Sequence, residues 1–196
     1  MNSFKDLAQQ LRTGNNVLIP DSLDGDINGV IQGTWIDAGI KEYTALAAAS
    51  HHGLDNAVAR LIELGANPNL SVKSLSEPRL IPPIELAIRS GKRTVVEILS
   101  PRVKPGLKVY KTCVSLAAEG GAEMLDLLVK GREREWAAHK QDIALAYLIL
   151  SGRDDPTGIA TLSKMDASPL SFLDGGNPVL FELIMRDVPG WMDAFD

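Results

Sequence analysis

Apolar residues in this chain recur mainly at the three- and four-residue spacing of an α-helix. The clearest stretch is 54–64, where one helical face carries Leu54, Ala57, Val58, Leu61 and Ile62. The preceding segment, 45–52, is rich in alanine and predicts a helix with little side-chain bulk. Thr44 can cap that helix, and Gly53 can end it because glycine adopts the left-handed conformation without a Cβ penalty. Residues 44–69 therefore predict a helix–turn–helix unit.

The same unit recurs along the chain. Residues 82–107 contain an apolar stripe of Val95, Val96 and Leu99, and residues 112–131 contain one of Leu125, Leu127 and Leu128. Weaker copies are expected at 133–158 and 168–190. In the former, a first helix over Glu133–Lys140 precedes a second helix in Ala144–Gly158. A single helix pair cannot bury its stripe alone, so the copies are expected to stack.

The segment 44–69, TALAAASHHGLDNAVARLIELGANPN, resembles an ankyrin repeat. The likeness lies in a TPLH-like opening, a short alanine helix, a glycine turn, a second helix and a GA(D/N)xN exit. It implies an all-α solenoid of about five repeats within a single domain, 1–196. The starts at 44, 82 and 112 lie 38 and 30 residues apart, against a family period of about 33. The TPLH histidine is replaced by Ala47, Glu85, Ser115 and Ser171, so the repeats are diverged.

The N-terminal region, 1–41, is expected to be a helical cap, with a degenerate first repeat as the alternative. Phe4–Leu11 predicts one amphipathic helix, ended by Gly14. Beyond it, the glycines obscure any period up to Lys41. The longest predicted loop is Leu70–Ile81, which is expected to project on the hairpin side.

Composition and the N-terminus favour a cytoplasmic or nuclear protein. Cys113 is the sole cysteine, so no disulfide can form within the chain. Lys5 and Asp6 lie where a signal peptide requires apolar residues, and the longest apolar run, Ile143–Leu150, is too short to span a bilayer. We expect no membrane association and a monomer in the absence of a partner.

The net charge of −5 argues against general binding to nucleic acid. Residues 79–111 nevertheless carry a local balance of +6, which leaves −11 for the rest. The basic side chains are Arg79, Arg89, Lys92, Arg93, Arg102, Lys104, Lys108 and Lys111, against Glu85 and Glu97. This block is either a solvated face or a surface for an acidic partner; no aromatic residues interleave it for stacking on bases.

No catalytic motif or metal-ligand spacing is apparent. His51 and His52 are adjacent, so on a helix their side chains diverge by about 100° and do not face one ion. Cys113 has no neighbouring base, and a packed thiol is the simpler interpretation. An enzyme or small-molecule binder that uses His51, His52 or Glu85 as acid–base groups stays open as the alternative function.

The resemblance implies binding to another protein through a concave groove. Carrying the family pattern over residue by residue places in that groove Tyr43, His51, His52, Ile81, Arg89, Ser90, Lys108, Lys111 and Glu119. Tyr43 and Arg89 are the expected anchors, because tyrosine and arginine dominate interface energetics. The main hypothesis is a stand-alone adaptor, inhibitor or assembly factor whose partner is a protein, with an acidic surface as one option. No cofactor, metal or nucleic acid is expected.

Overall fold

The computed structural model describes residues 3–15, 17–21, 24–151, 153 and 155–165. These residues are mostly helical, as expected for an all-α protein. The chain divides into two compact units, residues 1–104 and 105–196. The single-domain expectation stays a prediction, and the predicted repeat 168–190 lies outside the described residues.

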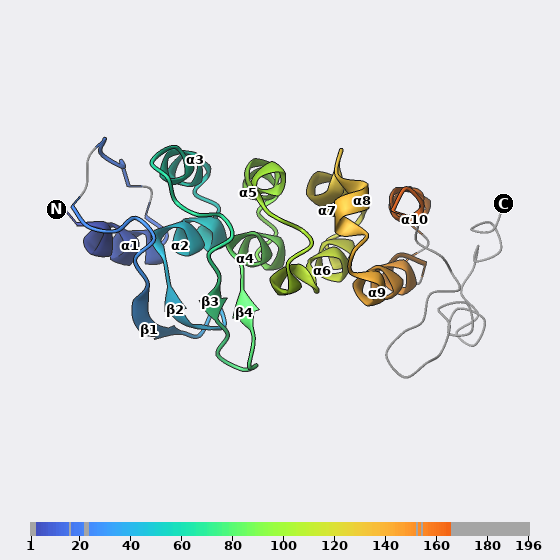
Figure 1. Ribbon diagram of the computed structural model, residues 1–196, viewed down its shortest axis with the longest axis horizontal. Helices are drawn as coiled ribbons and strands as arrows, with labels where there is room; N and C mark the ends of the chain where they lie inside the picture. The colour runs from blue at the N-terminus through green and yellow to red at the C-terminus, as the bar shows by residue number, and fades with distance from the viewer. Residues whose placement is uncertain (1–2, 16, 22–23, 152, 154, 166–196) are drawn as a thin grey trace. The chain divides into compact units, whose positions relative to one another are not determined.

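The first unit is a two-row array of helices with two β-hairpins. Its helices are α1 (Phe4–Arg12), α2 (Ala45–His52), α3 (Asp55–Glu63), α4 (Pro83–Arg89) and α5 (Arg93–Leu99), followed by the 3-10 turn η1 (Ser100–Arg102). Helices α1, α2 and α4 pack side by side in one row. Helices α3 and α5 pack on α2 and α4 and on each other, forming the second row (Figure 1).

The predicted helix pair over 44–69 is confirmed. Thr44 Oγ1 accepts a hydrogen bond from Ala47 N at 3.1 Å, and Gly53 ends α2 with φ of 73°. In α3, Val58 and Leu61 are buried, and each contributes roughly 2 kcal/mol by leaving water. The pair therefore forms where local capping and the apolar stripe agree.

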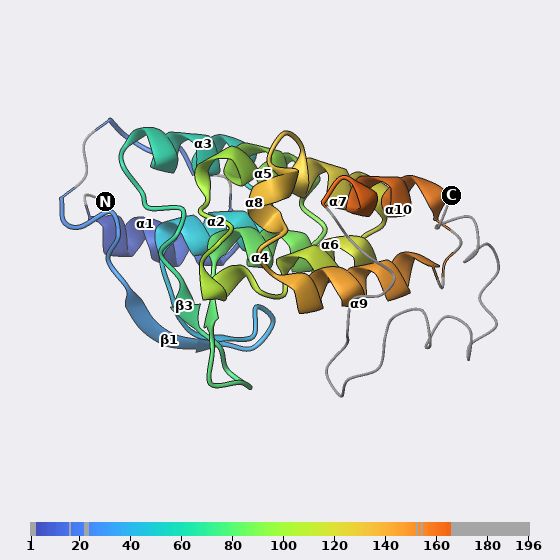
Figure 2. The same cartoon turned by 45° about the vertical axis from the view of Figure 1, so that its right-hand side comes forward.

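Two β-hairpins precede α2 and α4, where the sequence predicted irregular chain and a loop. Their strands are β1 (Ile31–Trp35), β2 (Ile40–Tyr43), β3 (Val72–Lys73) and β4 (Leu80–Ile81). Both pairs are antiparallel, with a bulge in β1 between Gln32 and Trp35. An Ile40–Ser74 bridge and a 2.7 Å bond from Leu75 N to Gly39 O join the hairpins (Figure 2). Strands of two to five residues are too short to give a periodic signal.

The N-terminal region contains the predicted helix and an irregular segment. Helix α1 buries Leu7, Ala8 and Leu11 and packs on α2. Residues 17–21 have no regular secondary structure: Ile19 is buried, and Asp21 forms an ion pair of 2.5 Å with Arg60 of α3. The described residues between α1 and β1 contain no second helix, and the choice between a cap and a degenerate first repeat stays a prediction.

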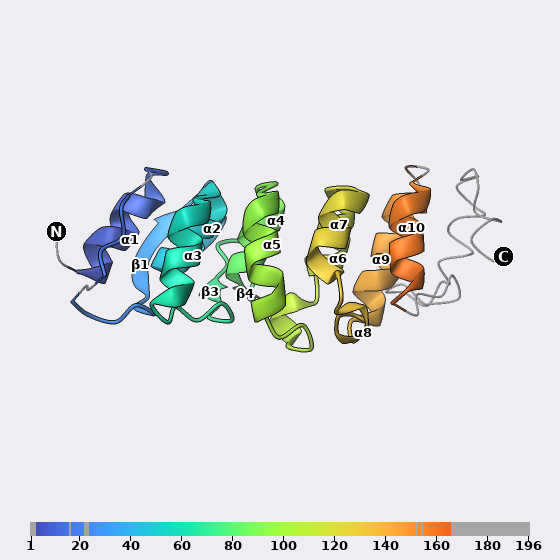
Figure 3. The same ribbon diagram turned by 90° about the horizontal axis from the view of Figure 1, so that it is seen from above.

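The second unit contains η2 (Lys108–Tyr110), α6 (Cys113–Glu119), α7 (Ala122–Val129), α8 (Glu133–Trp136), α9 (Lys140–Ser151) and α10 (Pro156–Ser163). Helix α9 packs beside α6, and α10 packs on α7 and α9 (Figure 3). The first unit shows the same arrangement: α4 packs beside α2, and α5 packs on α3 and α4.

The helix assignment for 133–158 was therefore wrong. The predicted first helix stops at Trp136, and the predicted second helix belongs to α9, which packs beside α6 and against α10. Most described α9 side chains from Asp142 to Leu150 are buried, so no one-sided stripe marks its face. Pro156 occupies the first turn of α10, where a missing N–H costs nothing.

Side-chain hydrogen bonds join many elements at similar sequence separations, between 27 and 40 residues. Examples from the two units are His51 with Ser90, Asn69 with Lys104, His139 with Pro105, and Asp155 with Ala122, at separations of 39, 35, 34 and 33 residues. Each unit is thus held together by contacts between one helix pair or connection and the next.

Candidate binding surface

The two hairpins bring exposed apolar and basic side chains together in the first unit. Ile36 is 77% exposed and Leu80 is 44% exposed, although both are large aliphatic residues. The turn after β1 lies beside the turn after β3 because Leu75 N donates to Gly39 O. We use the name hairpin surface for the exposed residues of the two turns and the strand ends beside them: Ile36, Asp37, Lys41, Lys73, Ser76, Glu77, Pro78 and Leu80.

A hollow of about 270 Å³ lies at this surface. Its lining is Lys41, Lys73, Ser74, Glu77, Pro78, Arg79 and Leu80. Leu80 and Pro78 supply its apolar part, and Lys41, Lys73, Arg79 and Glu77 supply charged groups, so the hollow suits an apolar side chain with polar neighbours. A hollow of this size accepts a side chain rather than a typical small-molecule ligand.

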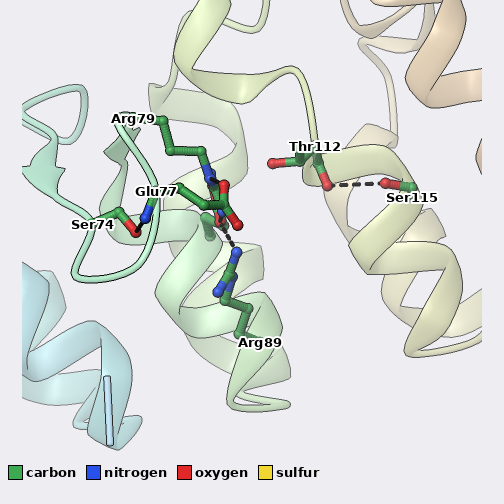
Figure 4. Close-up of polar contacts among 7 residues, drawn as sticks. Ser74, Glu77, Arg79, Arg89, Thr112 and Ser115 are labelled. Carbon is green, nitrogen blue, oxygen red and sulfur yellow. Dashed lines mark hydrogen bonds and ion pairs between the residues drawn. The ribbon is translucent and has the colours of Figure 1, made fainter. Parts of the chain in front are cut away.

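A buried carboxylate anchors the second hairpin to α4. Glu85 is 0% exposed, and Arg79, just before β4, donates to both of its oxygens at 2.7 and 2.9 Å. Arg89 reaches the same carboxylate at 2.8 Å, and Glu77 binds Arg79 at 2.5 Å (Figure 4). Hydrogen bonding to Glu85 raises the pKa of Arg79 above its usual range. The hairpin is therefore fixed by two arginines that converge on one buried charge.

Glu42 links the two hairpins. This buried side chain of β2 accepts hydrogen bonds from Lys73 N and Lys73 Nζ of β3, at 3.2 and 3.1 Å, and from Gln32 Nε2 of β1 at 3.1 Å. Burial acts to raise the pKa of Glu42, but the hydrogen bonds and the charge of Lys73 outweigh it, so the pKa is lowered. The carboxylate is thus held in its charged form between three strands.

Tyr43 and Ile81 are not exposed, which corrects their predicted place on a binding surface. Tyr43 is 2% exposed and Ile81 is 1% exposed. Each ends the second strand of its hairpin directly before a helix, and there the chain turns its side chain into the core. The Tyr43 ring contacts Trp35, with ring centroids 6.0 Å apart. Tyr43 therefore cannot serve as an exposed anchor.

His51, His52 and Ser90 do come together, as ties between helices of the first row. His51 Nδ1 and Ser90 Oγ are 2.9 Å apart, and His52 Nε2 donates to Arg12 O at 2.8 Å. Both imidazoles contact the Trp35 ring, at centroid distances of 4.8 and 5.3 Å. Burial, followed by the charges of His52 and Lys92, lowers the pKa of His51. The pair thus connects α1, α2 and α4.

The remaining predicted residues are exposed at least in part. Arg89 reaches solvent but is paired with Glu85. Lys108, Lys111 and Glu119 are exposed and belong to the second unit. Sequence reasoning missed Ile36, Lys41, Lys73 and Leu80; apolar and charged residues do not alternate in IKEY, 40–43, so this segment gave no strand signal.

The acid–base alternative finds no assembled site. Glu85 is buried and bonded to two guanidinium groups, and both histidines of the pair are engaged in structural hydrogen bonds. Across the described residues, no three His, Cys, Asp or Glu side chains are grouped to hold a metal ion. Within the same residues, no helix has the length and apolar character needed to cross a membrane.

Comparisons of the chain with models of protein families, with curated proteins and with solved structures find no significant match.

Proposed function

We propose that this chain is a diverged ankyrin-repeat protein that acts by binding another protein, as an adaptor, inhibitor or assembly factor. Three features support the repeat assignment: helix pairs in two rows, hairpins before α2 and α4, and ties at separations of 27 to 40 residues. The tie separations bracket the ankyrin period of about 33.

The hairpin surface is the proposed contact region, and its exposed aliphatic residues carry the proposal. Single exposed leucines are ordinary on protein surfaces. Here Ile36 and Leu80 stand on adjacent hairpins, and both hairpins are fixed from behind by buried carboxylates. A preorganised surface loses little conformational freedom on binding, so its apolar contacts are converted into affinity.

Lys41 gives the partner's chemistry. It lies with Leu80 in the lining of the hollow, whereas Lys73 is paired with Glu42, and Arg79 is paired with Glu77 and Glu85. The basic block of 79–111 is thus partly balanced internally, and Lys41 is the better candidate for an acidic partner.

Affinity capture from extracts of cells that produce the protein tests this function. Burying Ile36 and Leu80 contributes on the order of 3 kcal/mol, so the double variant I36D/L80D should weaken partner binding by about a hundredfold. L18D is the matched control, because Leu18 is 92% exposed but lies outside the hairpins. Thermal melts of all three proteins verify folding.

A partner that the wild type and L18D capture equally, and that the double variant loses, supports the proposal. Equal capture by I36D/L80D rejects it. K41E then tests the acidic side of the interface: it should slow association and reduce its dependence on salt.

A further inference from the structure

A second hollow of the first unit lies beside α3, away from the hairpin surface. Its volume is about 630 Å³. Helix α3 packs on α2 and α5, and neither of these helices contributes a residue to the hollow. The hollow therefore lies on a third side of α3. Its lining combines that side of the helix with the irregular segment after α1: Val17, Leu18, Ile19, Asp21, Asn56, Ala57 and Arg60.

The two-row arrangement leaves this side of α3 without a helix. First-row helices α2 and α4 carry α3 and α5 in the second row (Figure 3). Helix α1 is followed instead by segment 17–21. The connection beyond that segment still bonds to the next connection, because Asn28 Oδ1 accepts from Asn67 N at 2.8 Å. Asn69 Oδ1 accepts from Lys104 N at 2.8 Å in the same way after α3. Segment 17–21 thus stands where the following pairs have a second-row helix.

Segment 17–21 fills this place only in part. Ile19 is buried, and Asp21 is ion-paired with α3. Leu18, by contrast, is 92% exposed although it lines the hollow. Pro20 has no N–H group, so the segment cannot form a continuous ladder with an added strand. An aliphatic side chain is therefore left uncovered beside a helix face.

The size and charge of the hollow indicate its occupant. Two turns of an α-helix form a cylinder about 11 Å long and about 10 Å across, on the order of 850 Å³. The hollow takes up most of that volume and leaves one side of the helix in solvent. At the rim, Arg60 is paired with both Asp21 and Glu63, so two carboxylates share one guanidinium. A twofold contact between two copies would bring two such acidic rims together, which favours a basic partner over a second copy.

We propose that this hollow binds an amphipathic helix of another protein, which lies along α3 with aliphatic side chains on Leu18 and Ala57 and a basic side chain on Asp21. A helix satisfies its own backbone hydrogen bonds, so side-chain contacts with α3 are sufficient. The site goes beyond the proposed function, because none of its lining residues belongs to the hairpin surface.

Selection by the full chain from a displayed library of random peptides tests the proposal. A length of about 16 residues allows about four helical turns. We expect enriched peptides to carry apolar residues at i, i+3 or i+4, and i+7, with a lysine or arginine beside that stripe. One such peptide, synthesised with blocked ends, should bind saturably and gain helical circular dichroism on binding. With a nitrogen-15-labelled chain, it should shift the amide signals of Leu18, Asn56, Ala57 and Arg60.

Two substitutions of exposed residues separate the site from the fold. L18D removes the aliphatic contact and should weaken peptide binding at least tenfold, since Leu18 leaves water in the complex. N56W places a large side chain in the hollow and should weaken binding by a similar factor. I36D/L80D is the control and should bind the peptide as the wild type does. Thermal melts verify the folding of each variant.

A charge reversal isolates the contact with Asp21. D21K should weaken peptide binding about threefold, as expected for an exposed ion pair. Replacing the basic residue of the peptide with glutamate should restore affinity for D21K and weaken binding to the wild type.

The proposal is overturned by any of four results: enrichment of peptides without a helical pattern, equal binding by wild type, L18D and N56W, loss of binding in I36D/L80D, or a concentration-dependent dimer that N56W abolishes. The first two results leave the hairpin surface unaffected, and the third would assign the peptide to it. The fourth, measured by sedimentation, would make a second copy of the chain the occupant.

Discussion

Each unit contains a buried carboxylate that ties distant parts of the chain together, and the two carboxylates are balanced differently. Glu85 in the first unit is paired with the guanidinium groups of Arg79 and Arg89. Asp142 in the second unit accepts from Val114 N and Ser115 N, at 2.8 and 3.1 Å, and so caps α6 from the neighbouring helix α9. Burial raises the pKa of Asp142 to about 6 despite these bonds.

The difference shows what a buried charge needs. Two arginines compensate the charge of Glu85, so removal of this carboxylate leaves positive charge uncompensated in a buried site. Asp142 has backbone dipoles as partners, and these offset only part of its desolvation. The first unit should therefore respond strongly to mutation of its carboxylate, and the second unit should respond to pH.

The largest effect is expected from E85A. This change leaves Arg79 and Arg89 close together without their shared acid and should lower the free energy of unfolding by about 3–5 kcal/mol. Urea denaturation of the full chain, followed by circular dichroism, measures the loss. R89A is the control and should cost much less, because Arg89 is partly exposed and Arg79 remains paired. Equal losses for the two variants would mean that Glu85 is not the centre of the cluster.

The pH dependence of Asp142 comes next. Its folded pKa of about 6 exceeds the reference value of 3.8, so the unfolded state releases this proton more readily. Stability from this group is fully present below about pH 4 and is lost as pH rises to about 6, by up to roughly 3 kcal/mol. Wild type should therefore lose stability relative to D142N across this range and no more above it. A difference that is independent of pH would show that Asp142 titrates normally.

The smallest effect is expected from T44A. Thr44 caps its own helix by one hydrogen bond to Ala47 N, and removal of such a cap costs about 1 kcal/mol. T44S keeps the hydroxyl and should retain most of the stability. The effect should not vary between pH 4 and pH 7, unlike that of D142N, because no titratable group takes part in this cap. Thermal melts at both pH values measure it.

These cases also show which structural features could be predicted from the sequence and which could not. Thr44, Gly53 and the stripe through Val58 and Leu61 act within one helix pair, so local rules predicted α2 and α3. Asp142 acts on residues 27 and 28 positions earlier, and no local pattern reveals such a cap. The same limit hid the hairpins, whose pairing depends on contacts between separate segments.

The candidate site was predicted only in part. His51, His52 and Ser90 meet, but as ties rather than as a free binding face. The family pattern could not show that Tyr43 turns inward, because the side of the chain it faces depends on the register of β1 and β2. Exposure of Ile36 and Leu80 likewise follows from the hairpins and not from their residue types.

Hydrogen–deuterium exchange of the full chain, with and without the captured partner, tests the central claim most directly. The account predicts slower exchange on binding in residues 36–41 and 73–80, with I36D/L80D showing no such protection. Protection confined to other parts of the chain, or none at a saturating concentration of partner, would contradict binding through the hairpin surface.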